Sequence, residues 1–291
     1  MGKPVSLQVQ PANTVDLHFG LIADWEFDET NGVAAADSSG RTNTASLINY
    51  AGDDSQWVSG RIGGALNFNI LAGGALDPVH DNYAVTDGTI RFDNQDEFSF
   101  SYWIKRTEQD SGTFPRVITP FGETHWVLWG QGQGTGFHPP VLGFDPAVGV
   151  WEHYVVVYNR AAGTYGVYVD GTQKLSNATA SRSAPGETYW IIGHNENPAQ
   201  PGDYWYGMLD AVRIYNRLLA PAEVSELAHL GGITVVSLAR SSNNVVISWP
   251  GSGRLQSASQ VTGQWADVPE SPTSPYTNAP TGAAQFFRIA Q

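Results

Sequence analysis

Residues 151–171 read WEHYVVVYNRAAGTYGVYVDG, a pattern that predicts a β-hairpin. Trp151 to Tyr158 is rich in aromatic and β-branched residues, and Thr164 to Val169 repeats that composition after a turn from Asn159 to Gly163. The second strand ends in Asp170-Gly171, a dipeptide that favours a tight turn. The apolar faces of these strands must be covered by another sheet, so the hairpin indicates a layered β-protein.

Turn and strand signals continue outward from this hairpin in both directions. The segment Pro221 to Leu227 starts on Pro and has helical apolar spacing, which predicts one short helix. The predicted strands are residues 21–28, 65–68, 83–85, 98–104, 189–192 and 208–215, followed by short ones at 245–249, around 255 and 265, and at 286–289. The pattern restarts at Ile233, so we divide the chain into a tail (1–18), a β-sandwich (19–231) and a small β module (232–291).

The composition of the 291 residues is typical of an all-β protein without cysteine chemistry. Aromatic residues make up 12% and charged residues only 15%, while 32 Gly and 17 Pro supply turns. The lack of Cys excludes disulfides, thiolate zinc sites and a cysteine nucleophile. A net charge of −13 repels phosphate backbones, so we predict no nucleic-acid partner. No apolar run is long enough for a membrane span, so we predict no membrane insertion.

Four motifs occur in the order of a known family: GLIADWEFDETNG at 20–32, FSFSYWIK at 98–105, VWEHYVVVYN at 150–159 and GMLDAVRIYNRLLAPAEV at 207–224. From about Gly20 to Leu230 the chain resembles the laminin-G-like, concanavalin A-like jelly-roll superfamily. The resemblance implies a jelly-roll sandwich that binds carbohydrate or glycoprotein outside the cell, acts in adhesion, or assists a catalytic domain.

The C-terminal residues 245–290 resemble a fibronectin-like β module of large exported bacterial proteins. This resemblance implies a secreted protein or part of a larger exported system. The N-terminal residues Met1-Gly2-Lys3-Pro4 lack the apolar core of a signal peptide, so we expect that any such signal has been removed.

The resemblance of residues 20–230 to the laminin-G-like superfamily also implies a structural calcium ion. In similar proteins the Asp of the DSSG turn and the Asp of the last-strand motif lie close together, which maps onto Asp37 and Asp210, with Asp28 and Asn43 as neighbours. Carboxylate and carbonyl oxygens are the ligands that calcium prefers. Ala211 stands where such proteins usually carry another acid, which removes one ligand. The alternative is that Asp37 accepts hydrogen bonds from the amides of its own turn.

Residues 21–28 alternate apolar and acidic side chains, so a strand there places Asp24, Glu26 and Asp28 on one face. The row resembles the carboxylate row of retaining glucanases of concanavalin-like fold. Their chemistry needs two carboxyls roughly 5 Å apart with different pKa values. Here the row lies on the opening strand rather than on a central one, so a solvated or metal-facing row is the plainer interpretation.

Residues 120–140, PFGETHWVLWGQGQGTGFHPP, combine indole, imidazole and amide groups. An exposed Trp126 would cover the apolar face of a sugar, while Glu123 and His125 on one face of the segment would bind its hydroxyls. We therefore name Glu123, His125 and Trp126 as candidate ligand contacts. The alternative is that Trp126 and Trp129 are both core residues.

A second polar loop follows the predicted strand 189–192 and returns through an aromatic cluster. Such loops form a rim in related sandwiches, so further candidate sugar contacts are Trp190, His194, Asn195, Tyr204 and Trp205. The alternative is that these side chains pack at the ends of strands.

The leading interpretation is a calcium-stabilised polysaccharide-binding module of an exported protein, without catalysis. One alternative is a structural or adhesive module that binds protein partners. Another is a glycoside hydrolase or polysaccharide lyase, with its acid among Glu123, Asp145, Asp24, Glu26 and Asp28. The sequence contains no phosphate-binding Gly loop, nucleophile elbow or zinc-binding His helix, so it does not support phosphoryl transfer, serine hydrolysis or zinc proteolysis.

Overall fold

The predicted hairpin is present and continues into a third strand. β9 (Trp151–Asn159), β10 (Thr164–Val169) and β11 (Thr172–Thr179) are consecutive antiparallel neighbours. Asp170 and Gly171 join β10 to β11 with positive φ angles of 49° and 74°, as a two-residue hairpin turn of this type requires. The hairpin prediction and its Asp-Gly turn are therefore confirmed.

The computed structural model describes most of the chain, in segments. These are residues 15–68, 70, 72–74, 82–91, 96–107, 116–121, 146–179, 187–194, 204–230, 237–241, 244–248, 254–260, 264–269, 275–279 and 285–290. In these segments no helix is long and apolar enough to cross a membrane.

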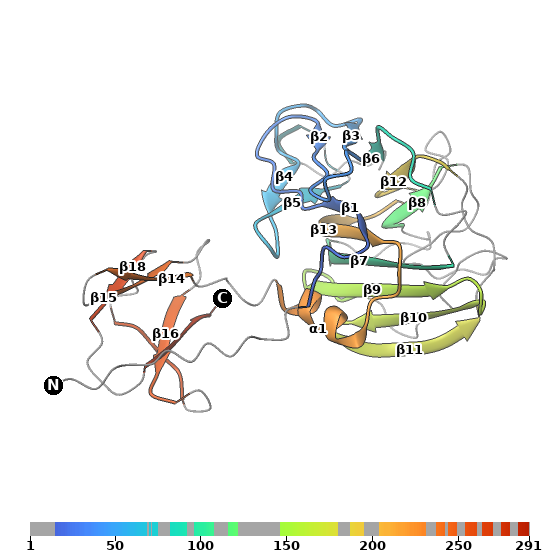
Figure 1. Cartoon of the computed structure of the whole chain (residues 1–291). Helices are drawn as coiled ribbons and strands as arrows, with labels where there is room; N and C mark the ends of the chain where they lie inside the picture. Colours follow the sequence, from blue (N-terminus) through green and yellow to red (C-terminus); the bar gives the residue numbers. More distant parts are fainter. Residues whose placement is uncertain are drawn as a thin grey trace.

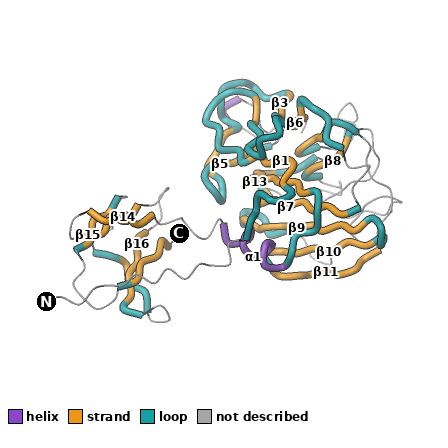
Figure 2. Tube along the Cα trace, viewed as in Figure 1, coloured by secondary structure: helices purple, strands orange, loops and turns teal. Residues whose placement is uncertain are grey.

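Two antiparallel sheets form the sandwich (Figures 1 and 2). The larger sheet has the order β11-β10-β9-β7-β13-β5-β4, and β1 also pairs with β13. Its other strands are β1 (Leu21–Trp25), β4 (Trp57–Ser59), β5 (Gly64–Asn67), β7 (Glu97–Arg106) and β13 (Gly207–Tyr215). The smaller sheet, in the order β2-β3-β6-β12-β8, consists of β2 (Ala34–Ala35), β3 (Ala45–Ile48), β6 (Tyr83–Thr86), β12 (Trp190–Ile192) and β8 (Ile118–Pro120). A 3-10 turn, η1, covers Ala72–Gly74.

The hydrophobic core lies between these two sheets. Phe100 of β7 packs on Trp190 of β12 with ring centroids 5.5 Å apart, which joins one sheet to the other. Ala23 and Trp25 of β1 belong to the same cluster. The predicted strand over 21–28 is shorter than expected, because β1 ends at Trp25. The predicted all-β sandwich is confirmed.

Helix α1 (Pro221–Leu230) covers part of the opposite face of the larger sheet. Val224 and Leu227 of the helix form a second apolar cluster with buried residues of four strands and a loop, namely Leu21, Val155, Tyr168, Tyr215 and Leu219. This face, which we call the outer face of the larger sheet, is therefore apolar beneath the helix.

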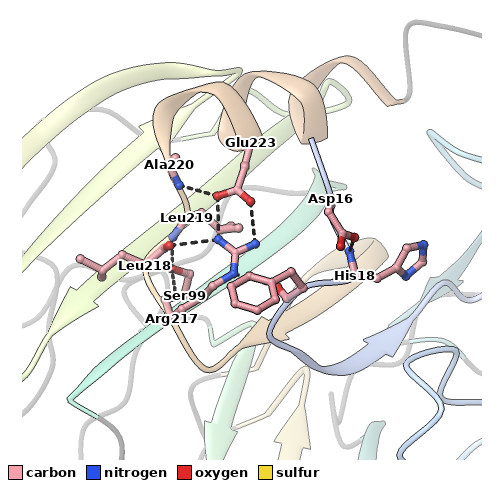
Figure 3. Close-up of polar contacts among 9 residues, drawn as sticks. Asp16, His18, Ser99, Arg217, Leu218, Leu219, Ala220 and Glu223 are labelled. Carbon is pink, nitrogen blue, oxygen red and sulfur yellow. Dashed lines mark hydrogen bonds and ion pairs between the residues drawn. The ribbon is translucent and has the colours of Figure 1, made fainter. Parts of the chain in front are cut away.

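Arg217 ties the helix to the start of the sandwich (Figure 3). Its two terminal nitrogens donate to the Glu223 carboxylate at 2.7 and 2.6 Å, and its Nε donates to the Phe19 carbonyl at 2.8 Å. Glu223 also accepts the backbone N–H of Ala220 and so caps the first turn of α1. The hydrogen bonds from Arg217 lower the pKa of Glu223. The two ends of the sandwich sequence are thus joined by a charged clasp.

The C-terminal strands form two further small sheets. One has the order β14-β15-β18 and the other β17-β16-β19. The strands are β14 (Ser237–Ser241), β15 (Asn244–Ser248), β16 (Arg254–Ala258), β17 (Ala266–Asp267), β18 (Tyr276–Asn278) and β19 (Phe286–Ala290). Ile247, Leu255 and Val268 form a core of their own. The predicted small β module is therefore present, while its domain boundaries and fibronectin-like character stay predictions.

Candidate functional site

A bulge in β13 places two charged residues on the outer face of the larger sheet. Asp210 pairs with Trp103 and Arg213 with Ser101, so two residues of β13 lie opposite a single residue of β7. Ala211, at the bulge, has a positive φ of 48°. The bulge shifts the alternation of side chains by one residue, so that Leu209 and Val212, three positions apart, both face the core. Asp210 and Arg213 consequently both point away from it.

Arg213 forms a buried ion pair with the first acid of the predicted row. Its Nε lies 3.1 Å from the Asp24 carboxylate, and one terminal nitrogen lies 3.5 Å from Glu26 Oε1. Burial raises the pKa of Asp24 to about 6 against the opposing pull of Arg213. Asp24 is thus held in a structural contact, whereas the side chain of Glu26 is 44% exposed.

Asp210 is completely buried and anchors a turn. Its Oδ2 accepts the backbone N–H groups of Arg61 and Ile62, each at 2.7 Å, in the loop between β4 and β5. Burial raises the pKa of Asp210 to about 7, although these hydrogen bonds act in the opposite direction. A Cβ on Gly60 would lie 2.6 Å from Asp210 Oδ2 and 1.9 Å from the Gly64 carbonyl oxygen, so the turn requires glycine there.

A serine and a histidine meet beside these acids, but both are buried. Ser101 Oγ lies 2.9 Å from His153 Nε2, and the Trp103 ring packs against the imidazole at 5.0 Å. Burial and the charge of Arg213 lower the pKa of His153 to about 3, which keeps the ring neutral. The pair therefore has neither the exposure nor the basicity of a nucleophile and its general base.

The predicted calcium ligands have other partners in this structure. Asp37 Oδ1 accepts the backbone N–H groups of Asp24 and Ser39, and its Oδ2 accepts the Ser39 hydroxyl and the Asn43 N–H, all at 2.8 to 2.9 Å. Burial opposes ionisation of Asp37, but these hydrogen bonds outweigh it and lower the pKa. Asp28 accepts the N–H of Gly64.

The donors around Asp37 occupy the roughly four acceptor positions of a carboxylate, so Asp37 does not fit the role of a calcium ligand. Within the described segments, no group of three or more His, Asp or Glu residues is arranged to hold a metal ion. The turn-closing alternative for Asp37 accounts for its contacts. Calcium binding itself stays a prediction, and nothing below depends on it.

The predicted aromatic rim is largely part of the core. Trp190 and Trp205 have no exposed surface, and both belong to the cluster between the sheets. The His194 ring is buried against Tyr83 and Tyr204, with centroids 5.5 and 4.7 Å away. Strand-end packing, the alternative given by the sequence, therefore describes these four candidate contacts. The other candidates, Glu123, His125, Trp126, Asp145 and Asn195, lie outside the described residues, as does Trp129.

Two other aromatic side chains are exposed side by side on the smaller sheet. Trp190 pairs with Pro120, and the ladder continues to Tyr189 and Phe121, whose N–H donates to the Tyr189 carbonyl at 2.8 Å. Directly opposed residues of neighbouring strands point to the same face. Phe121 is 48% and Tyr189 45% exposed. The pair presents two ring surfaces to solvent.

Polar groups flank this pair on the neighbouring strand. An antiparallel bridge between Ile90 and Thr188 places Thr89 beside Tyr189. The Thr89 hydroxyl donates to Glu187 Oε1 at 2.7 Å, and Arg91 lies 3.3 Å from the other oxygen of the same carboxylate. We call Thr89, Phe121 and Tyr189 the aromatic patch. It combines apolar ring faces with a hydroxyl, which is the chemistry of sugar recognition.

The sequence interpretation did not single out Phe121 or Tyr189, although a signal was present. Tyr189 precedes Trp190 in a predicted strand, and alternation places neighbours on opposite faces. Once Trp190 is buried, Tyr189 must point outward. The pattern alone could not say which of the two was buried.

Comparison with known proteins shows the family of the chain and several solved structures of similar fold. The sequence profile of the concanavalin A-like lectin/glucanases superfamily matches residues 77–225, just over half of the chain. Domain 4 of an extracellular arabinanase from Geobacillus stearothermophilus, in complex with arabinotriose, aligns with a TM-score of 0.52 and 21% identity. That alignment covers 72% of this chain and 98% of the arabinanase domain.

Two further solved structures align over a smaller share of their own length. The binding domain of Paraclostridial Mosquitocidal Protein 1 has a TM-score of 0.51 and 15% identity, over 87% of this chain and 64% of that one. Trypanosoma rangeli sialidase in complex with sialic acid has a TM-score of 0.48 and 21% identity over 72% of this chain, which spans only 33% of the sialidase. No curated protein matches the chain. At these identities the structural likeness is one of fold.

Proposed function

The chain belongs to the concanavalin A-like lectin/glucanases superfamily, and from that premise we propose that it is a non-catalytic polysaccharide-binding module of an exported protein. The aromatic patch is its binding site in this proposal. The observation that carries it is the exposed cross-strand pair of Phe121 and Tyr189 beside the Thr89 hydroxyl. Ring faces cover the C–H surfaces of sugars, and the hydroxyl offers a hydrogen-bonding partner.

The fate of the acidic row supports binding without catalysis. Asp24 is buried and paired with Arg213. β1 ends at Trp25 and Phe27 has a positive φ of 58°, so Glu26 and Asp28, although accessible, do not continue a regular strand row with Asp24. Retaining and inverting glycosidases both need two cooperating carboxyls. The regular row of three carboxylates on one strand face, which the resemblance to glucanases implies, is therefore not formed. The arabinanase domain, aligned over 98% of its length and solved with arabinotriose, supports a sugar as ligand.

Titration of the full chain against a glycan panel tests the proposal. We expect one or more polysaccharides to retard the chain in affinity gels, and Tyr189→Ala to weaken that binding by about tenfold or more. Phe121→Ala should act in the same direction. Phe19→Ala is the matched control, because it removes a 68% exposed ring from another surface. No retardation by any glycan, or equal loss in the control, would contradict the proposal.

A further inference from the structure

We infer that the polysaccharide recognised by the aromatic patch is uncharged, so that the site selects neutral glycans over those bearing uronate or sulfate groups. This inference rests on the proposed function, because it names the ligand class of the same site. The charge distribution around the patch and the chemistry of its three side chains carry it.

The charged side chains beside the patch neutralise one another. Glu187 holds the Thr89 hydroxyl with one carboxylate oxygen and faces Arg91 at 3.3 Å with the other. An incoming carboxylate or sulfate would compete with Glu187 for the same guanidinium and would meet repulsion from Glu187 itself. Among the described residues beside the patch, this arrangement therefore provides no surplus positive charge for an anionic sugar.

The net charge of the whole chain also disfavours an anionic ligand. The charge of −13, from 28 acidic and 15 basic residues, creates a field that opposes the approach of a polyanion. A neutral polymer has no such penalty. The repulsion is long-ranged at low ionic strength and is screened by salt, which gives the inference a measurable signature.

The groups that remain suit a neutral ligand. The rings of Phe121 and Tyr189 lie on neighbouring strands, with Cβ atoms separated by roughly 5 Å in such pairs. Both residues are nearly half exposed, so their adjacent rings form an open surface. Such a surface suits the middle of an extended sugar chain. The Thr89 O–H donates a hydrogen bond to Glu187, and its oxygen can still accept one from a sugar hydroxyl.

The experiment compares neutral polysaccharides (arabinan, xylan, mannan and mixed-linkage glucan) with anionic ones (polygalacturonate, alginate and chondroitin sulfate). The full chain and Tyr189→Ala are run in affinity gels and followed by calorimetry, at low and at high salt. We expect binding to at least one neutral polymer, a change in its affinity below about twofold with salt, and loss of that binding in Tyr189→Ala. Anionic polymers should not bind at low salt.

The outcomes separate this inference from the proposed function. Binding of an anionic polymer that is lost in Tyr189→Ala and weakens steeply with salt would overturn neutral selectivity and leave polysaccharide binding intact. Binding of neutral and anionic polymers with equal affinity would also overturn it. The absence of binding to every polymer would remove the proposed function and the inference together.

Discussion

Asp24 on the first strand of the sandwich and Arg213 on the last form a buried ion pair, with Nε 3.1 Å from the carboxylate. The two residues are direct partners in the β1–β13 ladder. Burial disfavours the charge on Arg213, but the attraction of Asp24 outweighs it and raises the arginine pKa. The pair therefore links residues 189 positions apart in sequence through a contact with little access to water.

Breaking this pair should be costly, and the two single variants should differ. Arg213→Met leaves a carboxyl whose pKa is already raised to about 6 and which can take up a proton, whereas Asp24→Asn leaves a guanidinium that keeps its charge. We expect losses of about 3–5 kcal/mol in the free energy of unfolding, with Asp24→Asn the larger. Urea denaturation measures both.

The exposed pair of Arg160 and Asp96, 3.0 Å apart, is the control for this prediction. Asp96→Asn should change the free energy of unfolding by less than about 1 kcal/mol, because surface ion pairs contribute little. A loss in Asp24→Asn no larger than that of the surface variant would show that the buried pair is not a stabilising link.

His153 should make stability depend on pH. Its pKa is about 3 in the folded chain and 6.5 in a model peptide, so the unfolded chain takes up the proton first as the pH falls. The imidazole therefore contributes stability above pH 6.5 that is lost progressively towards pH 3. Between pH 7 and pH 5.5 the loss is about 1.3 kcal/mol.

Urea unfolding of the wild type and His153→Gln at both pH values isolates this contribution. The difference in stability between the two proteins should shrink at pH 5.5 by about that amount, because Gln does not titrate. Asp24 and Asp210, whose folded pKa values are raised, gain relative stability as the pH falls, but they do so in both proteins. An unchanged difference would mean that the pKa of His153 is the same in the folded and the unfolded chain.

The sequence predicts the strands of this fold better than it predicts their faces. The hairpin over 151–171 and the strand over 208–215 are encoded by local composition and turn residues, and both are present. The bulge at Ala211 is not predicted, because strict alternation along the strand would place Arg213 on the same face as Leu209, and the shift depends on pairing with β7. That shift decides that Arg213 faces Asp24.

The candidate site was less predictable for the same reason. Their aromatic rings made Trp190 and Trp205 candidate sugar contacts. Large apolar side chains gain most from burial, however, and both indoles are part of the core. The exposed ring is Tyr189, one position away. A sequence gives the alternation along a strand, but the face that meets the second sheet is fixed only by packing between the layers.

Asp37 should stabilise the chain in the same way with and without calcium. Its carboxylate accepts four hydrogen bonds from the protein, so Asp37→Asn exchanges an acceptor oxygen for a donor beside backbone N–H groups. We expect a loss of about 1–3 kcal/mol in the free energy of unfolding. The loss should be equal in chelator and in excess calcium, measured by thermal or urea unfolding.

The wild type in the same two buffers tests the calcium prediction made from the sequence, which expects a higher melting temperature with calcium. A variant of Asp37 that is destabilised more in calcium than in chelator would make Asp37 a ligand after all. Equal loss, together with a calcium effect on the wild type, would place the ion at other residues.

Two neighbouring aromatic residues at the start of β12, Tyr189 just before the strand and Trp190 within it, should separate stability from binding. Tyr189→Ala removes a ring that is 45% exposed, so it should change the free energy of unfolding by less than about 1 kcal/mol. Trp190→Ala empties a fully buried core position and should cost about 3–5 kcal/mol.

Urea unfolding and glycan affinity are measured on the same preparations, with Trp190→Phe as the milder core variant. Trp190→Phe should keep glycan binding while Tyr189→Ala loses it. The reverse pattern would return the binding role to the indole that the sequence first suggested.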